Sequence, residues 1–153
     1  MKLVFTVLLF SLISVYAEGQ LPSKVKKITG IWKYKSGDGF EVWTLKDDIL
    51  LGTAFRINKV GDTTKVEDLK IRKVNKTLVY TVNSKNFIED SLVIDDHNFV
   101  GTKKKMEFFN IESNIPVMIR YSFGFLNRNK LKISIQYGIK DEPVELILNR
   151  LKD

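Results

Sequence analysis

Residues 30–45 read Gly-Ile-Trp-Lys-Tyr-Lys-Ser-Gly-Asp-Gly-Phe-Glu-Val-Trp-Thr-Leu, and this stretch decides the fold. Apolar and polar side chains alternate on both sides of Ser36-Gly37-Asp38-Gly39, which consists of residues that favour tight turns. Two alternating runs joined by a short glycine-containing turn predict an antiparallel β-hairpin. The Gly30-Ile31-Trp32 triplet opens the first of its two strands.

The same alternation continues to the end of the chain, with turn residues at regular intervals. No segment after the N-terminal apolar run has a helical apolar period of useful length. The predicted strands cover residues 28–35, 40–45, 49–59, 63–74, 77–82, 87–94, 98–110, 116–125, 130–137 and 144–151. Turns are predicted at residues 83–86 and 95–97, and a bend at Gly101. We therefore expect an all-β protein, an antiparallel up-and-down meander closed into a barrel of about 8–10 strands.

The N-terminus is typical of a secretory signal peptide. Lys2 precedes the apolar run Leu3–Val15, and Val15-Tyr16-Ala17 places small residues where a signal peptidase cleaves. We expect a signal peptide over 1–17, a loose lead-in over 18–27 and one barrel domain over 28–153, with no transmembrane segment after cleavage. A buried N-terminal helix or an uncleaved anchor is the alternative. The expected location is outside the cytoplasm, periplasmic or secreted.

The chain has 153 residues, a formal net charge of +7 and no cysteine. Disulfides and thiolate metal sites are therefore excluded, and the lack of disulfides suits a periplasmic or secreted bacterial protein. Lysines gather at residues 24–27 and 103–105, between interspersed acids. This pattern predicts a solvated basic surface, and the alternative is attraction to an anionic envelope surface. No nucleic-acid-binding motif accompanies the charge, so no nucleic-acid partner is expected.

Alternation along strands also predicts which side chains share the barrel interior. The residues expected there, as candidates for ligand binding, are Glu41, Trp43, Glu67, Tyr80, Phe108, Asn110, Ile119 and Tyr121. A charged group on an apolar face is costly unless it is paired. Glu41 and Glu67 are open to four interpretations: a hydrolytic acid and base, anchors for a ligand hydroxyl or cation, structural ion-pair members, or outward residues if the register is shifted by one.

Signals of enzymatic chemistry are otherwise missing. The single histidine, His97, stands beside Asp95 and Asp96 in a predicted turn, and one histidine cannot build a multi-histidine metal site. No nucleophile elbow, phosphate-binding loop or dinucleotide fingerprint occurs. No catalytic residue, metal or cofactor is therefore predicted.

Trp32 near the start and Arg150 near the end are expected to close the barrel. A planar guanidinium stacks well on an indole, so the pair is predicted to tie the first strand to the last. This Gly-x-Trp start with a closing arginine resembles the pattern of lipocalin-like β-barrels, with Gly30, Trp32 and Arg150 as the structural closure. The resemblance implies a cup-shaped barrel that binds a small molecule.

The order of shorter motifs resembles one group in particular, an uncharacterised family of exported, mainly bacterial lipocalin-like domains. The matching segments are Gly30 and Trp32, Glu41-Val42-Trp43-Thr44, Leu51-Gly52, Glu67-Asp68-Leu69-Lys70-Ile71 and Leu78-Val79-Tyr80. The family's most specific motif, Phe-Glu-Asn-Pro-x-His-Asp-Phe-Pro followed by Ile and Tyr, aligns with residues 108–121. Phe108, Asn110, Pro116, Ile119 and Tyr121 keep its spacing, whereas its His-Asp pair is replaced. The resemblance implies the barrel and brings no established activity.

The expected function is that of an exported, non-enzymatic protein that binds a small apolar or amphipathic molecule. Two alternatives stay open. One is a hydrolase that uses Glu41 or Glu67, and the other is a filled barrel that acts through its basic surface on envelope partners.

Overall fold

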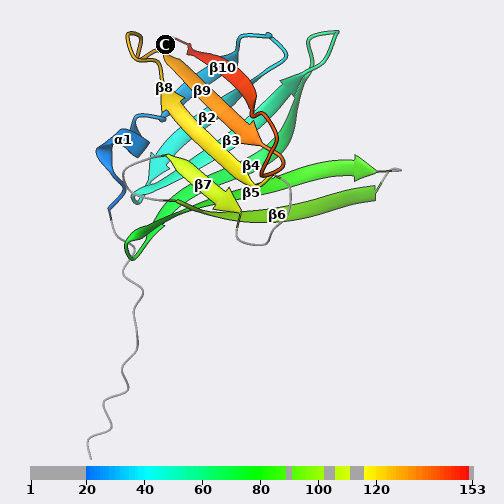
Figure 1. The fold of residues 1–153 in the computed structure, drawn as a ribbon. Helices are drawn as coiled ribbons and strands as arrows, with labels where there is room; N and C mark the ends of the chain where they lie inside the picture. Colours follow the sequence, from blue (N-terminus) through cyan, green and yellow to red (C-terminus); the bar gives the residue numbers. More distant parts are fainter. Residues whose placement is uncertain (1–19, 89–90, 102–105, 111–115, 152–153) are drawn as a thin grey trace, which may run out of the picture.

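The computed structural model describes residues 20–88, 91–101, 106–110 and 116–151 (Figure 1), so the predicted signal peptide lies outside the described residues. The described chain is almost entirely β-structure, with one short helix, α1 (Ser23–Lys26). The strands are β1 (Gly30–Tyr34), β2 (Gly39–Lys46), β3 (Ile49–Ile57), β4 (Thr63–Val74), β5 (Thr77–Ile88), β6 (Ser91–Gly101), β7 (Glu107–Asn110), β8 (Met118–Phe123), β9 (Lys130–Gln136) and β10 (Val144–Arg150). The helix is far too short to cross a membrane, and no other helix occurs among these residues that would be long and apolar enough to do so.

Every strand pairs antiparallel with its neighbours in sequence, and β1 also pairs with β10. The sheet therefore closes on itself as an up-and-down barrel of ten strands (Figure 1), which confirms the predicted all-β meander. Between β6 and β7, Phe99–Gly101 pair with Phe108–Asn110. Closure removes both sheet edges, which would otherwise present unpaired backbone groups.

The prediction was wrong between residues 83 and 97. The two predicted turns at 83–86 and 95–97 are continuous strand, because β5 and β6 form one long hairpin in which Asn83 lies opposite Asp96. Among the described residues, the parts of β5 beyond Ser84 and of β6 before Phe99 pair only with each other, and the hairpin projects past the rest of the barrel (Figure 1). The Asn, Ser and Asp residues at 83–86 and 95–97 favour turns locally, and the pairing of β5 with β6 overrides this preference.

The lead-in is also better packed than predicted. Leu21 and Val25 are 3 % and 1 % exposed, and α1 lies against one end of the barrel (Figure 1). The Leu21 N–H donates to Asp48 Oδ2 at 2.6 Å, and Lys26 forms an ion pair with the same carboxylate. Residues 20–28 therefore cover the end of the barrel where β2 turns into β3.

The first and last strands are joined by side chains as well as by backbone pairing. Trp32 lies opposite Arg150 in the β1–β10 register, and the guanidinium carbon is 4.2 Å from the centre of the indole ring. Arg150 also donates to the backbone oxygens of Thr29 and Lys27, at 2.6 and 2.7 Å. The predicted stacking of Arg150 on Trp32 is thus present, and it anchors the segment that leads into β1.

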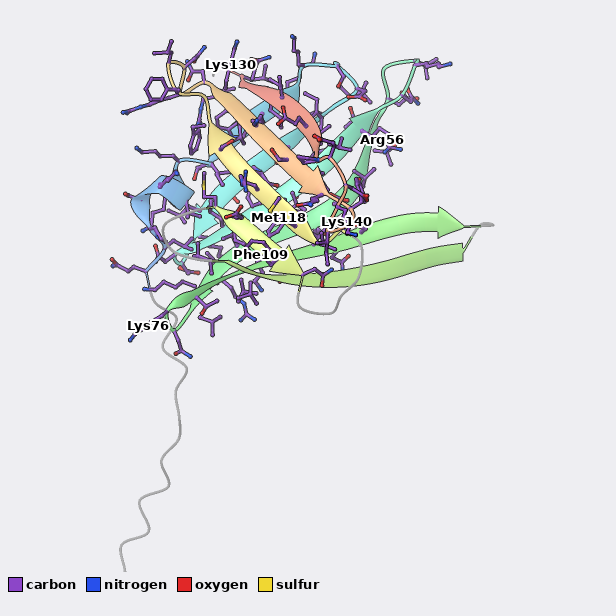
Figure 2. All side chains as sticks on the ribbon, viewed as in Figure 1. Arg56, Lys76, Phe109, Met118, Lys130 and Lys140 are labelled. Atoms are coloured by element: carbon purple, nitrogen blue, oxygen red, sulfur yellow. The ribbon has the colours of Figure 1, made fainter. Side chains whose placement is uncertain are left out.

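Alternation orders the interior as expected, with Trp32, Trp43, Leu50, Ile71, Leu78 and Phe108 all fully buried. On β2 the buried face ends at Trp43. Alternation places Leu45 on the same face as Glu41 and Trp43, but its side chain is 41 % exposed. Charged side chains cover the outside, as Figure 2 shows for Arg56 and Lys140 on the right and Lys76 at the lower left.

Candidate functional site

The barrel contains a cavity of about 430 Å³. Its buried wall includes Glu41, Tyr80, Ile119, Tyr121 and Ile133. Exposed lining residues mark the opening: Ser36, Asp38, Arg56 and Tyr137. The opening therefore lies at the end where β1 turns into β2, and the cavity reaches inward from there.

Strand register brings Glu41 and Glu67 to the same level of the cavity wall. Glu41 on β2 lies opposite Ala54 on β3, and Ala54 lies opposite Glu67 on β4. The two acids are thus two strand spacings apart, about 10 Å between their backbones. The small side chain of Ala54 leaves the space between the two carboxyl groups to the cavity.

Glu41 is the most unusual residue of the cavity, a carboxyl group that is only 3 % exposed. Tyr34 Oη donates to Glu41 Oε1 at 2.9 Å, and Trp43 Nε1 donates to Glu41 Oε2 at 2.7 Å. Burial raises the pKa of Glu41 to about 7, against the opposing effect of these two hydrogen bonds, and the nearby Glu67 raises it further. Glu41 therefore changes its charge close to neutral pH.

Glu67 stands in a less buried environment. Ser84 Oγ on the next strand donates to Glu67 Oε1 at 3.2 Å. The pairing of β3 with β4 shifts register between Ala54 and Phe55, which lie opposite Glu67 and Lys65 respectively. Such an irregularity re-aims side chains locally, and here Phe55, Val66 and Glu67 all line the cavity.

Aromatic side chains form the deep wall. The Tyr80 and Tyr121 hydroxyls are 3.1 Å apart and share a hydrogen bond, and their rings meet edge to face. Tyr121 also meets the Trp43 ring edge to face, and Tyr80 contacts Phe108. Burial, together with the negative charge of Glu41, raises the pKa of both tyrosines well above its usual value. Both phenols therefore stay protonated, so this wall offers ring surface and neutral hydroxyl groups.

Gly52 makes room for the Trp43 ring. The two residues lie opposite each other on β2 and β3, and a methyl group at Gly52 would come within 2.8 Å of the indole. The ring can lie over the glycine backbone only because no side chain is there. This placement brings Trp43 Nε1 to the Glu41 carboxylate.

The structure brings together most of the predicted interior residues. Glu41, Glu67, Tyr80, Ile119 and Tyr121 line the cavity. Trp43 and Phe108 do not line it, because they are fully buried behind Glu41 and Tyr80. Asn110 lies outside the cavity lining, where its Nδ2 donates to the Pro116 carbonyl at 3.2 Å.

The sequence interpretation missed several residues of the cavity, above all Tyr34. Alternation places Tyr34 on the same face of β1 as Trp32, so the signal was available. Ser84 was missed because it was assigned to a turn, although it belongs to β5. Asp38 and Arg56 line the opening and had no distinguishing signal in the sequence.

The described side chains include no group of three or more His, Cys, Asp or Glu arranged to hold a metal ion. What the site offers is apolar and aromatic area with a few converging polar groups. In comparisons with known proteins, no protein-family model, no curated protein and no solved structure matches this chain.

Proposed function

We propose that this protein is a non-enzymatic, lipocalin-like binding protein that acts outside the cytoplasm and holds a small apolar or amphipathic molecule in its barrel. The observation that carries the proposal is the cavity of about 430 Å³, open at one end and lined by apolar and aromatic side chains with few polar groups. Pockets for small molecules typically have volumes of about 300–1,000 Å³ and this kind of lining.

The arrangement of polarity within the cavity suits an amphipathic ligand. Ile119, Ile133 and the tyrosine rings offer contact area to an apolar body, whereas Glu41 and Glu67 lie together on the β2–β4 side. A ligand with one polar end and one apolar end satisfies both regions, because a polar group left without a partner in the cavity would oppose binding.

The test is native mass spectrometry of the protein purified from its own host, together with thermal-shift screening against lipids and hydrophobic small molecules. We expect a copurified molecule or a rise in Tm for some members of the panel. Ala54→Leu places three more carbon atoms in the cavity between Glu41 and Glu67, and should weaken or abolish the response. Thr53→Leu introduces the same side chain at the neighbouring position, which does not line the cavity, and should preserve the response. No copurified molecule and no thermal response would refute the proposal.

A second candidate, a hydrolase, is favoured by one observation: burial raises the pKa of Glu41 to about 7 beside a second carboxylate, Glu67. A protonated acid near an ionised one is the pair that glycoside hydrolysis uses. Separate Glu41→Ala and Glu67→Ala variants should then each lose turnover of a responsive substrate. Unchanged turnover in both variants would eliminate this candidate.

The remaining alternative was a filled barrel that acts through its basic surface. The cavity argues against a filled interior. Of the two lysine clusters, residues 103–105 lie outside the described residues.

A further inference from the structure

Glu41 has no cationic partner among the described residues. Its two contacts are the neutral donors Tyr34 and Trp43. The other ionisable groups that face it are Glu67 on β4, Tyr80 on β5 and Tyr121 on β8, and none of them carries a positive charge. An ionised carboxylate at 3 % exposure without a counter-charge is costly, because burial removes the water that would solvate it.

Among the described residues that line the cavity, acids outnumber bases, although the protein as a whole is basic. The chain carries a net charge of +7, yet the charged lining residues described are Asp38, Glu41 and Glu67 against Arg56. Arg56 is exposed at the opening, so the buried part of the cavity holds carboxyl groups and no described cation. This distribution favours a positively charged group inside and disfavours an anion.

The hydrogen-bonding capacity of Glu41 supports the same conclusion. A carboxylate has about four acceptor sites, and Tyr34 and Trp43 occupy one on each oxygen. An ammonium group has three N–H donors that can use the remaining sites. The rings of Tyr34, Tyr80 and Tyr121 line the same cavity and can attract a cation through their faces.

We propose that the cavity takes a cationic amphiphile, a molecule with a protonated amine at one end of an apolar body, and that the Glu41 carboxylate binds the ammonium group with Glu67 reinforcing the negative field. The inference rests on the proposed binding function and specifies the chemical class of the ligand. The apolar body lies against Ile119, Ile133 and the aromatic wall.

Binding of such a ligand is coupled to the ionisation of Glu41. Because burial raises the pKa of Glu41 to about 7, the free protein is largely protonated there below neutral pH. The ammonium group binds the ionised form, so the complex lowers the pKa of Glu41 and a proton is released on binding. Affinity for the amine therefore rises with pH between about 5 and 8, whereas affinity for a neutral ligand of the same shape does not depend on Glu41 in this way.

The experiment compares three probes with the same eight-carbon body: n-octylamine, 1-octanol and octanoate. Isothermal titration calorimetry at pH 8 should show octylamine binding at least tenfold more tightly than either of the others. At pH 5 this preference should fall by tenfold or more. Titrations near pH 6.5, in two buffers of different ionisation enthalpy, should show that protons are released when octylamine binds.

Variants separate the role of Glu41 from a general effect of charge. Glu41→Gln should weaken octylamine binding at pH 8 by tenfold or more and leave 1-octanol binding unchanged. Asp68→Asn removes the carboxylate next to Glu67 in sequence, on a side chain that pairs with Lys65 outside the cavity, and should change neither affinity. If Glu41→Gln does not fold, the pH dependence and proton release of the unmodified protein still decide the question.

The outcomes distinguish the two proposals. Equal binding of all three probes at pH 8, or an amine preference that persists in Glu41→Gln, overturns the cation inference and leaves the binding function intact. If no probe binds, the cation inference fails. The binding function fails with it only if no molecule copurifies with the protein and the thermal-shift panel gives no response.

Discussion

Gly30 should be irreplaceable because of its backbone conformation and its contact with Arg150. Its φ is +126°, in a region that residues with a side chain rarely adopt. A methyl group at this position would also come within 2.5 Å of Arg150 Nη1. We therefore expect Gly30→Ala to destabilise the barrel in two separable ways, through backbone strain and through displacement of the guanidinium group.

The expected losses of stability follow from the strain and from the contacts that each substitution disturbs. Backbone strain at such a φ costs about 1–3 kcal/mol. Displacing Arg150 weakens the hydrogen bond to the Thr29 oxygen and the contact with Trp32. Those interactions contribute about 1.5–3 and about 0.5–2 kcal/mol, and the lower ends apply because water can reach the partly exposed carbonyl groups. We expect a loss of about 3–5 kcal/mol for Gly30→Ala and about 2–4 kcal/mol for Arg150→Ala.

A double-mutant cycle tests whether the cost of Gly30→Ala divides into backbone strain and displacement of Arg150. Once Arg150 is replaced by alanine, a methyl group at residue 30 has nothing to displace, so Gly30→Ala should then cost only its strain. The double variant should be more stable than additivity predicts by about 1–2 kcal/mol. Urea denaturation followed by circular dichroism measures the free energies of unfolding. Effects that add to within about 0.5 kcal/mol would refute the reasoning.

Two further predictions concern the buried acid and the covered end. Because burial raises the pKa of Glu41 from its usual 4.5 to about 7, the folded protein holds a proton that the unfolded chain releases, so stability should fall by about 3 kcal/mol as pH rises through that window. Glu41→Gln should lack this slope in urea denaturation at pH 4.5–8, and an unchanged slope would contradict the assignment. Asp48→Gly removes the contacts to Leu21 and Lys26 and should speed tryptic cleavage within residues 20–28. Asp47→Gly, also at positive φ, should leave cleavage unchanged, and equal rates in the two variants would count against this anchoring role.

The cavity shows how far alternation along a strand carries a prediction. Alternation correctly placed Glu41 and Glu67 on the inward faces of their strands. A shift by one residue would have moved every side chain of β2 and β4 to the other face. Alternation did not show that Ala54 lies between the two acids, because the neighbour across a strand pair depends on register between strands and not on the pattern within one. Trp43 was correctly turned inward, yet its role as a donor to Glu41 depends on Gly52, which lies opposite on another strand.

The hairpin of β5 and β6 is a region that the sequence pattern did not predict correctly. The polar residues at 83–86 and 95–97 favour turns when each short segment is taken alone. In the structure both segments pair with each other across the hairpin, and this pairing overrides the local preference. The packing of Leu21 and Val25 was hidden for a related reason, because a single turn of helix is too short to show a period.

The sequence by itself determined that this chain forms an antiparallel meander, since a period of two is a local property that one strand displays alone. It also determined that acids and aromatic residues share the inward faces. Only the tertiary structure decided that the interior keeps an open space, that Tyr34 and Trp43 both donate to Glu41, and that no described cation meets this carboxylate. Those properties depend on distances between strands far apart in sequence, and these distances are set by how the barrel closes.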